Sequence, residues 1–282
     1  MDTPDTVLLF DIDGTLTDPR EPLVRTMSDA LGNLSVPFHV AAGSNMDLVE
    51  PQFLELLYEH GFRKDFHAFV NNGSTHYFCP FSDSYKLELV EAFDFEKHLG
   101  TDDFNWLMSE LAAAMELPEF ALGEGVQVMG DQVKSRGSMV NFSPSGRPAA
   151  GVLSEEALAN RKAFVAFDKA NLYRAKLVDF LKSKVARLID EKDLKIMLGG
   201  ETSFDIVIDG QDKTASVRWC LERGFKNIVF VGDALFPGGN DSVITDWISK
   251  WSGEGTCPVE AIQVDGWKDT LCKLEARGWL PK

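Results

Sequence analysis

One short stretch near the amino terminus limits the possible folds more than any other part of the chain. Residues 6–10 read Thr-Val-Leu-Leu-Phe, an unbroken apolar run that ends at Asp11. Strands that are apolar on both faces are typical of parallel sheets covered by helices on either side. The polar sequence Asp11-Ile-Asp-Gly-Thr follows at once. The pattern therefore predicts a buried parallel strand whose carboxyl end carries functional side chains.

The rest of the chain shows a change in pattern that predicts two structural parts. Strand and helix alternate at first, with strands expected at 6–10, 36–42 and 66–70 and helices at 23–31 and 47–60. Strict alternation then stops, with helices expected at 83–125 and 155–190 and strands at 126–129, 138–142, 195–198 and 204–208. It returns after residue 210, with helices at 213–223 and 267–277 and strands at 227–231 and 259–264. We predict an α/β core, a doubly wound parallel sheet built from 1–82 and 210–282, interrupted by an inserted α+β module at 83–209.

The charge of the chain excludes several classes of partner. The 282 residues include 28 Lys and Arg against 44 Asp and Glu, which gives a net charge of −16. Such a chain repels phosphate backbones and anionic lipids, so we expect neither nucleic acid nor membrane as a partner. No apolar run approaches the length of a membrane span, and the acidic start lacks the basic residues of a signal peptide. A cytoplasmic location is expected, and the net charge still permits a small anionic ligand in a locally basic pocket.

Acidic residues gather at the expected strand ends. Asp11 and Asp13 are two residues apart, so on an extended strand their side chains face the same way. Their mutual repulsion would be relieved by a divalent cation, and oxygen ligands suit Mg²⁺. Asp233 and Asp241, after a later strand, would complete an oxygen-rich site. The predicted metal ligands are therefore Asp11, Asp13, Asp233 and Asp241.

A hydroxyl and a cation at other strand ends suit a phosphoryl group. Ser44 follows the second expected strand, and Lys213 opens a helix. Considered alone, Ser44 would more often be a helix cap and Lys213 a solvated surface residue. With all of these residues in order along the chain, Asp11 is a candidate nucleophile that forms an aspartyl-phosphate. Asp13 is then a candidate general acid and base for the substrate oxygen.

These four motifs, Asp11-Ile-Asp-Gly-Thr, Ser44, Lys213 and Gly232-Asp with Asn240-Asp241, resemble those of the haloacid dehalogenase (HAD) superfamily. The resemblance implies a HAD-like core with an inserted cap. It implies that Asp11 is the phosphorylated nucleophile and Asp13 the acid/base, while Ser44 and Lys213 hold phosphate. It further implies Mg²⁺ on Asp11, the backbone carbonyl of Asp13 and Asp233, with Asn240 or Asp241 close by.

A narrower resemblance lies in the inserted module. The segments Arg136-Gly-Ser-Met-Val-Asn-Phe-Ser-Pro-Ser-Gly-Arg147 and Gly199-Gly-Glu-Thr-Ser-Phe-Asp205 are similar to eukaryotic-type phosphomannomutase. The resemblance implies that the cap sets substrate specificity and that its arginines bind the distal phosphate of a hexose phosphate. The substrate-binding residues it implies are Arg20, Arg136, Met139, Asn141, Arg147, Arg161, Ser203 and Asp205.

Three functions agree with these motifs. The first is a phosphohexomutase that interconverts mannose 1-phosphate and mannose 6-phosphate, or glucose phosphates, with a hexose 1,6-bisphosphate activator. The second is a magnesium-dependent HAD sugar-phosphate phosphatase, in which water accepts the phosphoryl group. The third is a non-catalytic binding protein, which the presence of both Asp11 and Asp13 disfavours. The resemblance also implies a homodimer formed through the cap.

Overall fold

The computed structural model describes residues 5–148, 154–253 and 255–281 and divides into two compact units. One unit comprises residues 1–92 and 210–282, and the other comprises Phe93–Asp209. The sequence predicted the first boundary after residue 82. The structure places it later because β5 (Glu88–Ala92) pairs with β4 (Thr75–Cys79) and so belongs to the core sheet.

The core unit contains a seven-stranded sheet in the order β11-β10-β1-β2-β3-β4-β5. Its first five strands are parallel, and β4 and β5 extend it in antiparallel fashion. The parallel strands are β1 (Thr6–Phe10), β2 (Phe38–Ala41), β3 (Phe66–Val70), β10 (Asn227–Gly232) and β11 (Val259–Gln263). The carboxyl ends of these strands share one edge, where the polar residues predicted from the sequence follow β1, β2 and β10.

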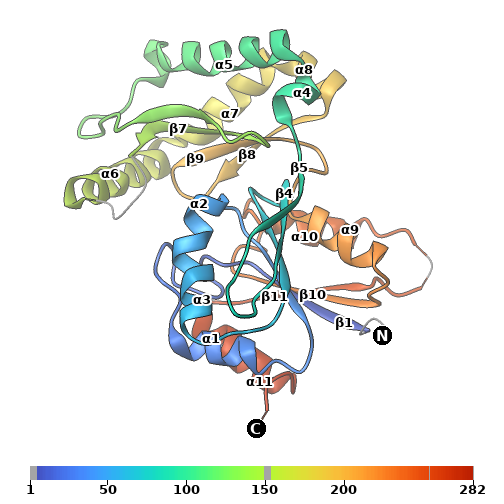
Figure 1. Ribbon diagram of the computed structural model, residues 1–282. Helices are drawn as coiled ribbons and strands as arrows, with labels where there is room; N and C mark the ends of the chain where they lie inside the picture. The colour runs from blue at the N-terminus through green and yellow to red at the C-terminus, as the bar shows by residue number, and fades with distance from the viewer. Residues whose placement is uncertain (1–4, 149–153, 254, 282) are drawn as a thin grey trace. The chain divides into compact units, whose positions relative to one another are not determined.

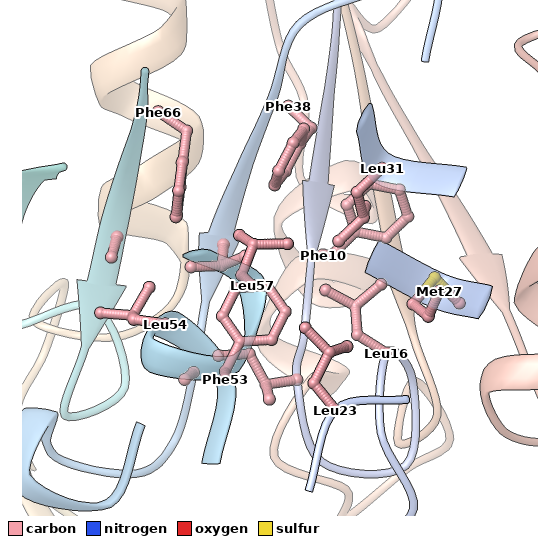
Figure 2. Packing of buried hydrophobic residues seen from close by; sticks show 14 of the residues in the cluster. Phe10, Leu16, Leu23, Met27, Leu31, Phe38, Phe53, Leu54, Leu57 and Phe66 are labelled. Atoms are coloured by element: carbon pink, nitrogen blue, oxygen red, sulfur yellow. The ribbon is translucent and has the colours of Figure 1, made fainter. Parts of the chain in front are cut away.

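Helices cover both faces of this sheet (Figure 1). One face packs against α1 (Arg25–Gly32), α3 (Glu55–Glu59) and α11 (Trp267–Ala276), and the other against α9 (Thr214–Glu222) and α10 (Ser242–Ser249). The side chains of β1 alternate between the two cores, with Leu8 and Phe10 on the first face and Val7 and Leu9 on the second. Figure 2 shows the first core, where Phe10 packs with Leu16 and Leu57. The predicted doubly wound parallel sheet is therefore confirmed.

The helix predicted at 47–60 is continuous but irregular. It consists of α2 (Met46–Val49), a π-helical turn η1 (Glu50–Leu54) and α3. Pro51 lies in the π-helical turn, and because it has no N–H to donate, it interrupts the regular hydrogen bonds of the continuous helix there. Such turns are rare and are often found at functional sites.

Two predictions of local structure were wrong. Residues 83–92, expected to be helical, include the edge strand β5, every residue of which is exposed. The first cap strand was expected at 126–129 but is β6 (Asp131–Ser135), which pairs with β7 (Val140–Arg147). In both cases pairing with the strand next to it in the sequence, rather than local apolar pattern, decides the structure.

The cap unit has a four-stranded antiparallel sheet in the order β6-β7-β9-β8. Its last strands are β8 (Leu194–Gly199) and β9 (Ser203–Ile208). The helical elements are α4 (Phe95–Leu99), α5 (Thr101–Met115), η2 (Pro118–Phe120), α6 (Glu155–Asn171), α7 (Tyr173–Lys184) and α8 (Ala186–Lys192). Phe142 and Phe204 pack with Leu177 and other helical residues in one core. Their neighbours along the strands, Asn141 and Ser203, therefore belong to the opposite face of the sheet.

Among the described residues, none of the helices combines the length and the apolar character that crossing a bilayer requires.

Candidate active site

A buried lysine joins two carboxylates at the carboxyl edge of the core sheet. Lys213 and Asp241 are the residues that precede α9 and α10, and Asp11 follows β1. The Lys213 Nζ lies 2.8 Å from Asp11 Oδ1 and 2.5 Å from Asp241 Oδ1. Lys213 and Asp241 have no solvent-exposed surface, and Asp11 is only 3% exposed. The lysine predicted to hold phosphate thus also holds the candidate nucleophile in place.

Burial changes the protonation equilibria of this cluster. It raises the pKa of Asp11 to about 8, opposed by the attraction of Lys213 and reinforced by the repulsion of Asp241. Burial by itself lowers the pKa of Lys213, but its two carboxylate partners outweigh burial and raise it overall. Burial and the charge of Asp241 also raise the pKa of Asp233, to about 6. The carboxylates of this cluster, when ionised, carry more negative charge than the single ammonium group of Lys213 can balance.

A group of three carboxylates could hold a metal ion here. Asp11, Asp233 and Asp241 each offer a carboxylate oxygen, and these oxygens lie within 4.8 Å of one another. If all three are ionised beside Lys213, two negative charges remain, which a divalent cation would neutralise. The hard oxygen donors suit Mg²⁺. Asp241 is already engaged at both oxygens, since its Oδ1 contacts Lys213 and its Oδ2 accepts from the Ala234 N–H at 3.2 Å.

The approach of Asp233 depends on a glycine. Gly14 has a φ of 79°, a conformation that residues with a side chain rarely adopt. A Cβ at this position would overlap the carboxylate of Asp233. Gly14 therefore leaves the space that the Asp233 carboxylate occupies.

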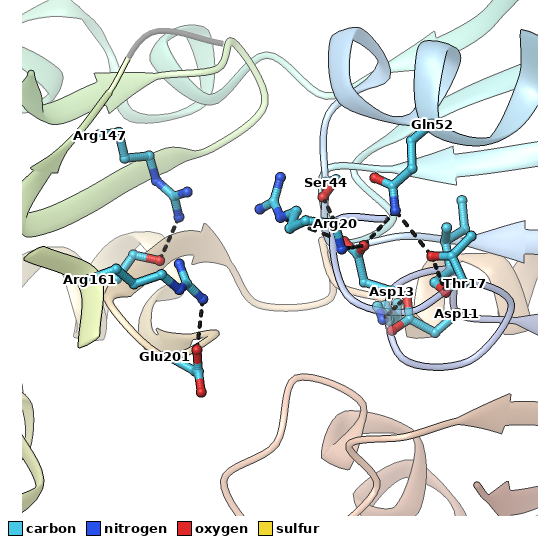
Figure 3. A network of polar contacts seen from close by, with 12 residues as sticks. Asp11, Asp13, Thr17, Arg20, Ser44, Gln52, Arg147, Arg161 and Glu201 are labelled. Carbon is cyan, nitrogen blue, oxygen red and sulfur yellow. Dashed lines mark hydrogen bonds and ion pairs between the residues drawn. The ribbon is translucent and has the colours of Figure 1, made fainter. Parts of the chain in front are cut away.

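Asp13 is held apart from this carboxylate group by its own set of donors. Its Oδ1 accepts from Gln52 Nε2 at 2.7 Å and from the Arg20 backbone N–H at 2.9 Å. Its Oδ2 accepts from Ser44 Oγ at 3.3 Å and lies 3.9 Å from Arg20 Nε (Figure 3). The two aspartates of the motif thus have different surroundings, as different chemical roles require. The Asp13 side chain is not part of the three-carboxylate group found among the described residues.

A second polar cluster lies on the cap sheet. Arg147, at the end of β7, donates from Nη2 to Ser203 Oγ at 2.8 Å and from Nε to Asn141 Oδ1. Asn141 in turn donates from Nδ2 to Asp205 Oδ1 at 2.7 Å. Gly199 allows the close approach of Asp205, because a Cβ there would meet its carboxylate at 2.8 Å. Four of the predicted substrate-binding residues are therefore joined in one network of hydrogen bonds.

The remaining predicted cap residues have other surroundings. Arg161, on α6, donates from Nη2 to Glu201 Oε2 at 2.9 Å, and both side chains are partly exposed (Figure 3). The Arg136 backbone N–H donates to the Met139 carbonyl at 2.8 Å in the β6–β7 connection. The Met139 side chain is fully buried.

Sequence reasoning missed three residues that the structure brings to these clusters. Gln52 contacts Asp13, and Glu201 pairs with Arg161. Arg174 is held by Asp168 at 2.7 Å and donates to the Gly200 carbonyl at 2.8 Å, next to the residues that bind Arg147. Glu201 lies within the segment 199–205 quoted above, whereas Gln52 and Arg174 belong to no such motif, and the contacts of all three become visible only in the folded chain.

The matches to known proteins span both units of the chain. The model of the family described as eukaryotic phosphomannomutase matches residues 35–252. The chain belongs to the eukaryotic phosphomannomutase family. Phosphomannomutase 1 of Dictyostelium discoideum is 31% identical over 248 residues, which cover 86% of this chain and 88% of that protein. The phosphomannomutase of Schizosaccharomyces pombe is 32% identical over 243 residues, covering 84% of each chain.

Solved structures share the fold of this phosphomannomutase family member. The IMP-bound, N-terminally truncated IMP-nucleotidase of Plasmodium falciparum superposes with a TM-score of 0.58 at 13% identity. The match covers 96% of this chain and 67% of that chain. At this identity the likeness concerns the fold alone, and it agrees with the HAD-like core and inserted cap predicted from the sequence.

Proposed function

We propose that this enzyme interconverts mannose 1-phosphate and mannose 6-phosphate through an aspartyl-phosphate on Asp11. One observation carries the proposal: Asp11 is buried beside Lys213, while the neighbouring Asp13 is held separately by Gln52, Arg20 and Ser44. This arrangement supplies a fixed nucleophile and a separate acid/base within one short motif. Family membership supports a hexose phosphate as the substrate.

The reaction requires two transfers with the same residues. An Asp11 oxygen attacks the phosphorus of a hexose 1,6-bisphosphate activator, and the bond from phosphorus to the sugar oxygen breaks as Asp13 gives that oxygen a proton. In the reverse sense, the free hydroxyl of the other monophosphate attacks the aspartyl-phosphate and Asp13 accepts its proton. Ser44 and Lys213 would donate to the phosphoryl oxygens during both transfers.

Mg²⁺ would be held by the carboxylates of Asp11 and Asp233 and, as the family resemblance implies, by the backbone carbonyl of Asp13, while Asp241 holds Lys213. When bound, the ion would neutralise charge on the transferred phosphoryl group. Asp13 would contribute its carbonyl rather than its side chain, because the side chain already accepts hydrogen bonds from Gln52 and the Arg20 backbone N–H.

The cap would bind the distal phosphate. Arg147, Arg136 and Arg161 offer guanidinium groups, whose forked donors match phosphate oxygens. Asn141, Ser203 and Asp205 would face the sugar, since they share a network with Arg147. Arg20 would assist from the core. The homodimer through the cap and the cytoplasmic location stay predictions.

Phosphorus NMR tests the proposed function. The protein is mixed with mannose 1-phosphate, MgCl₂ and a trace of a hexose 1,6-bisphosphate, and the signals are followed with time. We expect the signal of mannose 6-phosphate to grow until equilibrium. Inorganic phosphate without any mannose 6-phosphate would instead assign the protein to the sugar-phosphate phosphatases and refute the mutase proposal.

A further inference from the structure

Gln52 makes an unusually complete set of contacts next to Asp13. Its Nε2 group has two N–H bonds, and it donates to Asp13 Oδ1 at 2.7 Å and to Thr17 Oγ1 at 3.1 Å (Figure 3). Its backbone carbonyl accepts from the Leu23 N–H at 3.0 Å. The side chain and the backbone of Gln52 are thus both tied to the loop that follows β1.

The surroundings keep Gln52 and Asp13 at a fixed separation. Phe53 and Leu54, the next two residues, are fully buried in the same hydrophobic core as Ile12 and Leu16, which flank Asp13. Figure 2 shows Phe53 near Leu23, with Leu54 further along the same core. Because buried cores are densely packed, the amide has little freedom to move relative to the carboxylate.

The contacts also make the two oxygens of Asp13 unequal. Oδ1 receives two donors, the Gln52 amide and the Arg20 backbone N–H. Oδ2 faces Ser44, the residue proposed to bind the phosphoryl group, at a longer distance of 3.3 Å. An oxygen that already accepts two short hydrogen bonds is poorly placed to exchange a proton with substrate.

We propose that Gln52 is a positioning residue that holds Asp13 by Oδ1 and thereby assigns proton transfer to Oδ2. The inference rests on the proposed function, because it takes Asp13 as the acid/base. Gln52 touches no reacting atom and acts only through the orientation of Asp13. Its loss would let the carboxylate rotate, and small misplacements of a catalytic group cost large factors in rate.

Leaving-group chemistry separates this role from a merely structural one. A sugar alkoxide is a poor leaving group and needs the proton of Asp13, whereas 4-nitrophenolate leaves without protonation. Single-turnover phosphorylation of Asp11 is therefore measured with two donors, a hexose 1,6-bisphosphate and 4-nitrophenyl phosphate. The variants are Gln52→Leu, which removes the amide, and Gln52→Glu, which keeps the size but places a second carboxylate against Asp13 Oδ1.

We expect both variants to slow phosphorylation by the sugar bisphosphate about 10- to 100-fold, with a small change for 4-nitrophenyl phosphate and for KM. Gln127→Leu is the matched control, an exposed cap residue whose backbone pairs with Asn160, and it should leave both rates unchanged. Equal slowing with both donors, or no slowing with either, would overturn the inference. A wild-type protein that forms no phosphoenzyme from either donor would overturn the proposed function itself, whatever the variants do.

Discussion

The buried core site and the exposed cap pair Arg161–Glu201 hold their charges in opposite environments. In the core, Lys213 and Asp241 are completely buried, and Asp11 nearly so, with ion pairs of 2.8 Å and 2.5 Å. In the cap, the Arg161 and Glu201 side chains are 37% and 64% exposed. A buried charge pair is fixed, because breaking it leaves an unpaired charge in the interior. An exposed pair exchanges partners easily, because water screens it.

The difference agrees with the tasks proposed for the two units. Transfer of the phosphoryl group needs the nucleophile in one orientation for every substrate, and a buried, prearranged cluster supplies that. Binding of the distal phosphate must accept and release either end of a bisphosphate, and partly exposed arginines can do this. The variants below test whether the core controls the rate of chemistry and the cap controls binding.

The largest effect is expected in the core. Asp11→Asn should lower kcat at least about 10⁴-fold, because the amide cannot act as the nucleophile. Lys213 keeps its second partner, Asp241, so thermal unfolding should change little. Mutase assays and a melting curve measure the two effects, and activity close to wild type would rule out Asp11 as the nucleophile.

Removal of the buried ammonium group should cost stability as well as activity. Lys213→Met leaves Asp11 and Asp241 buried without a cation, and such a loss costs about 3–5 kcal/mol in the free energy of unfolding. Urea unfolding measures it. Lys226→Met is the matched control, because Lys226 pairs with Asp5 on the exposed surface and should matter little. Equal losses in the two variants would show that burial does not set the strength of these pairs.

The cap should respond through binding. Arg147→Ala removes the guanidinium that links Asn141 and Ser203, and one charge-assisted phosphate contact, at about 2–4 kcal/mol, corresponds to about 30- to 1,000-fold in kcat/KM. Steady-state kinetics with mannose 1-phosphate should place most of the loss in KM. An unchanged kcat/KM would mean that the phosphate clamp lies elsewhere.

A second buried cluster in the core should make stability depend on pH. His39, His67 and His76 surround Trp219, and burial lowers their pKa values to about 3, 4 and 4. The unfolded chain binds protons near pH 6.5 while the folded chain does not, so stability present above pH 6.5 is lost as the pH falls toward 4. Each imidazole should remove about 1 kcal/mol between pH 6.5 and 5.5.

Urea unfolding at several pH values measures this dependence. In His67→Gln, the free energy of unfolding should depend less on pH, by the contribution of one imidazole. Asp11 and Asp233 also titrate, but they do so equally in the variant and in the wild type. Parallel curves for the variant and the wild type would show that His67 does not contribute.

The smallest effect concerns the exposed cap pair. Glu201→Gln should release Arg161 for phosphate and lower KM by up to about fivefold, with kcat unchanged, because exposed ion pairs contribute up to about 1 kcal/mol. The effect should shrink at high salt. A raised KM would mean that Glu201 supports substrate binding instead of competing with it.

The sequence predicted the parts of this molecule that local pattern determines. The apolar strand before Asp11, the strand ends at Ser44 and Asp233, and the inserted module all follow from spacing and composition. The local sequence pattern did not predict β5, because it is the pairing with β4 that makes these residues a strand.

Contacts between side chains far apart in the sequence could not be predicted either. Gln52 and Asp13 are 39 positions apart, and Arg161 and Glu201 are 40 apart. No periodicity marks either pair, since only the folded chain brings them together.

The π-helical turn at Glu50–Leu54 has a further consequence for the helix that carries it. A π-helical turn contains one residue more than the regular α-helix around it. Deleting a residue from this turn would produce a smoother helix, yet it would rotate one flank against the other by about 100°. Either Gln52 would turn away from Asp13, or the apolar side chains of α3 would leave their core. The extra residue of the π-helical turn lets Gln52 contact Asp13 while the apolar side chains of α3 pack in their core. A regular helix could not make both contacts.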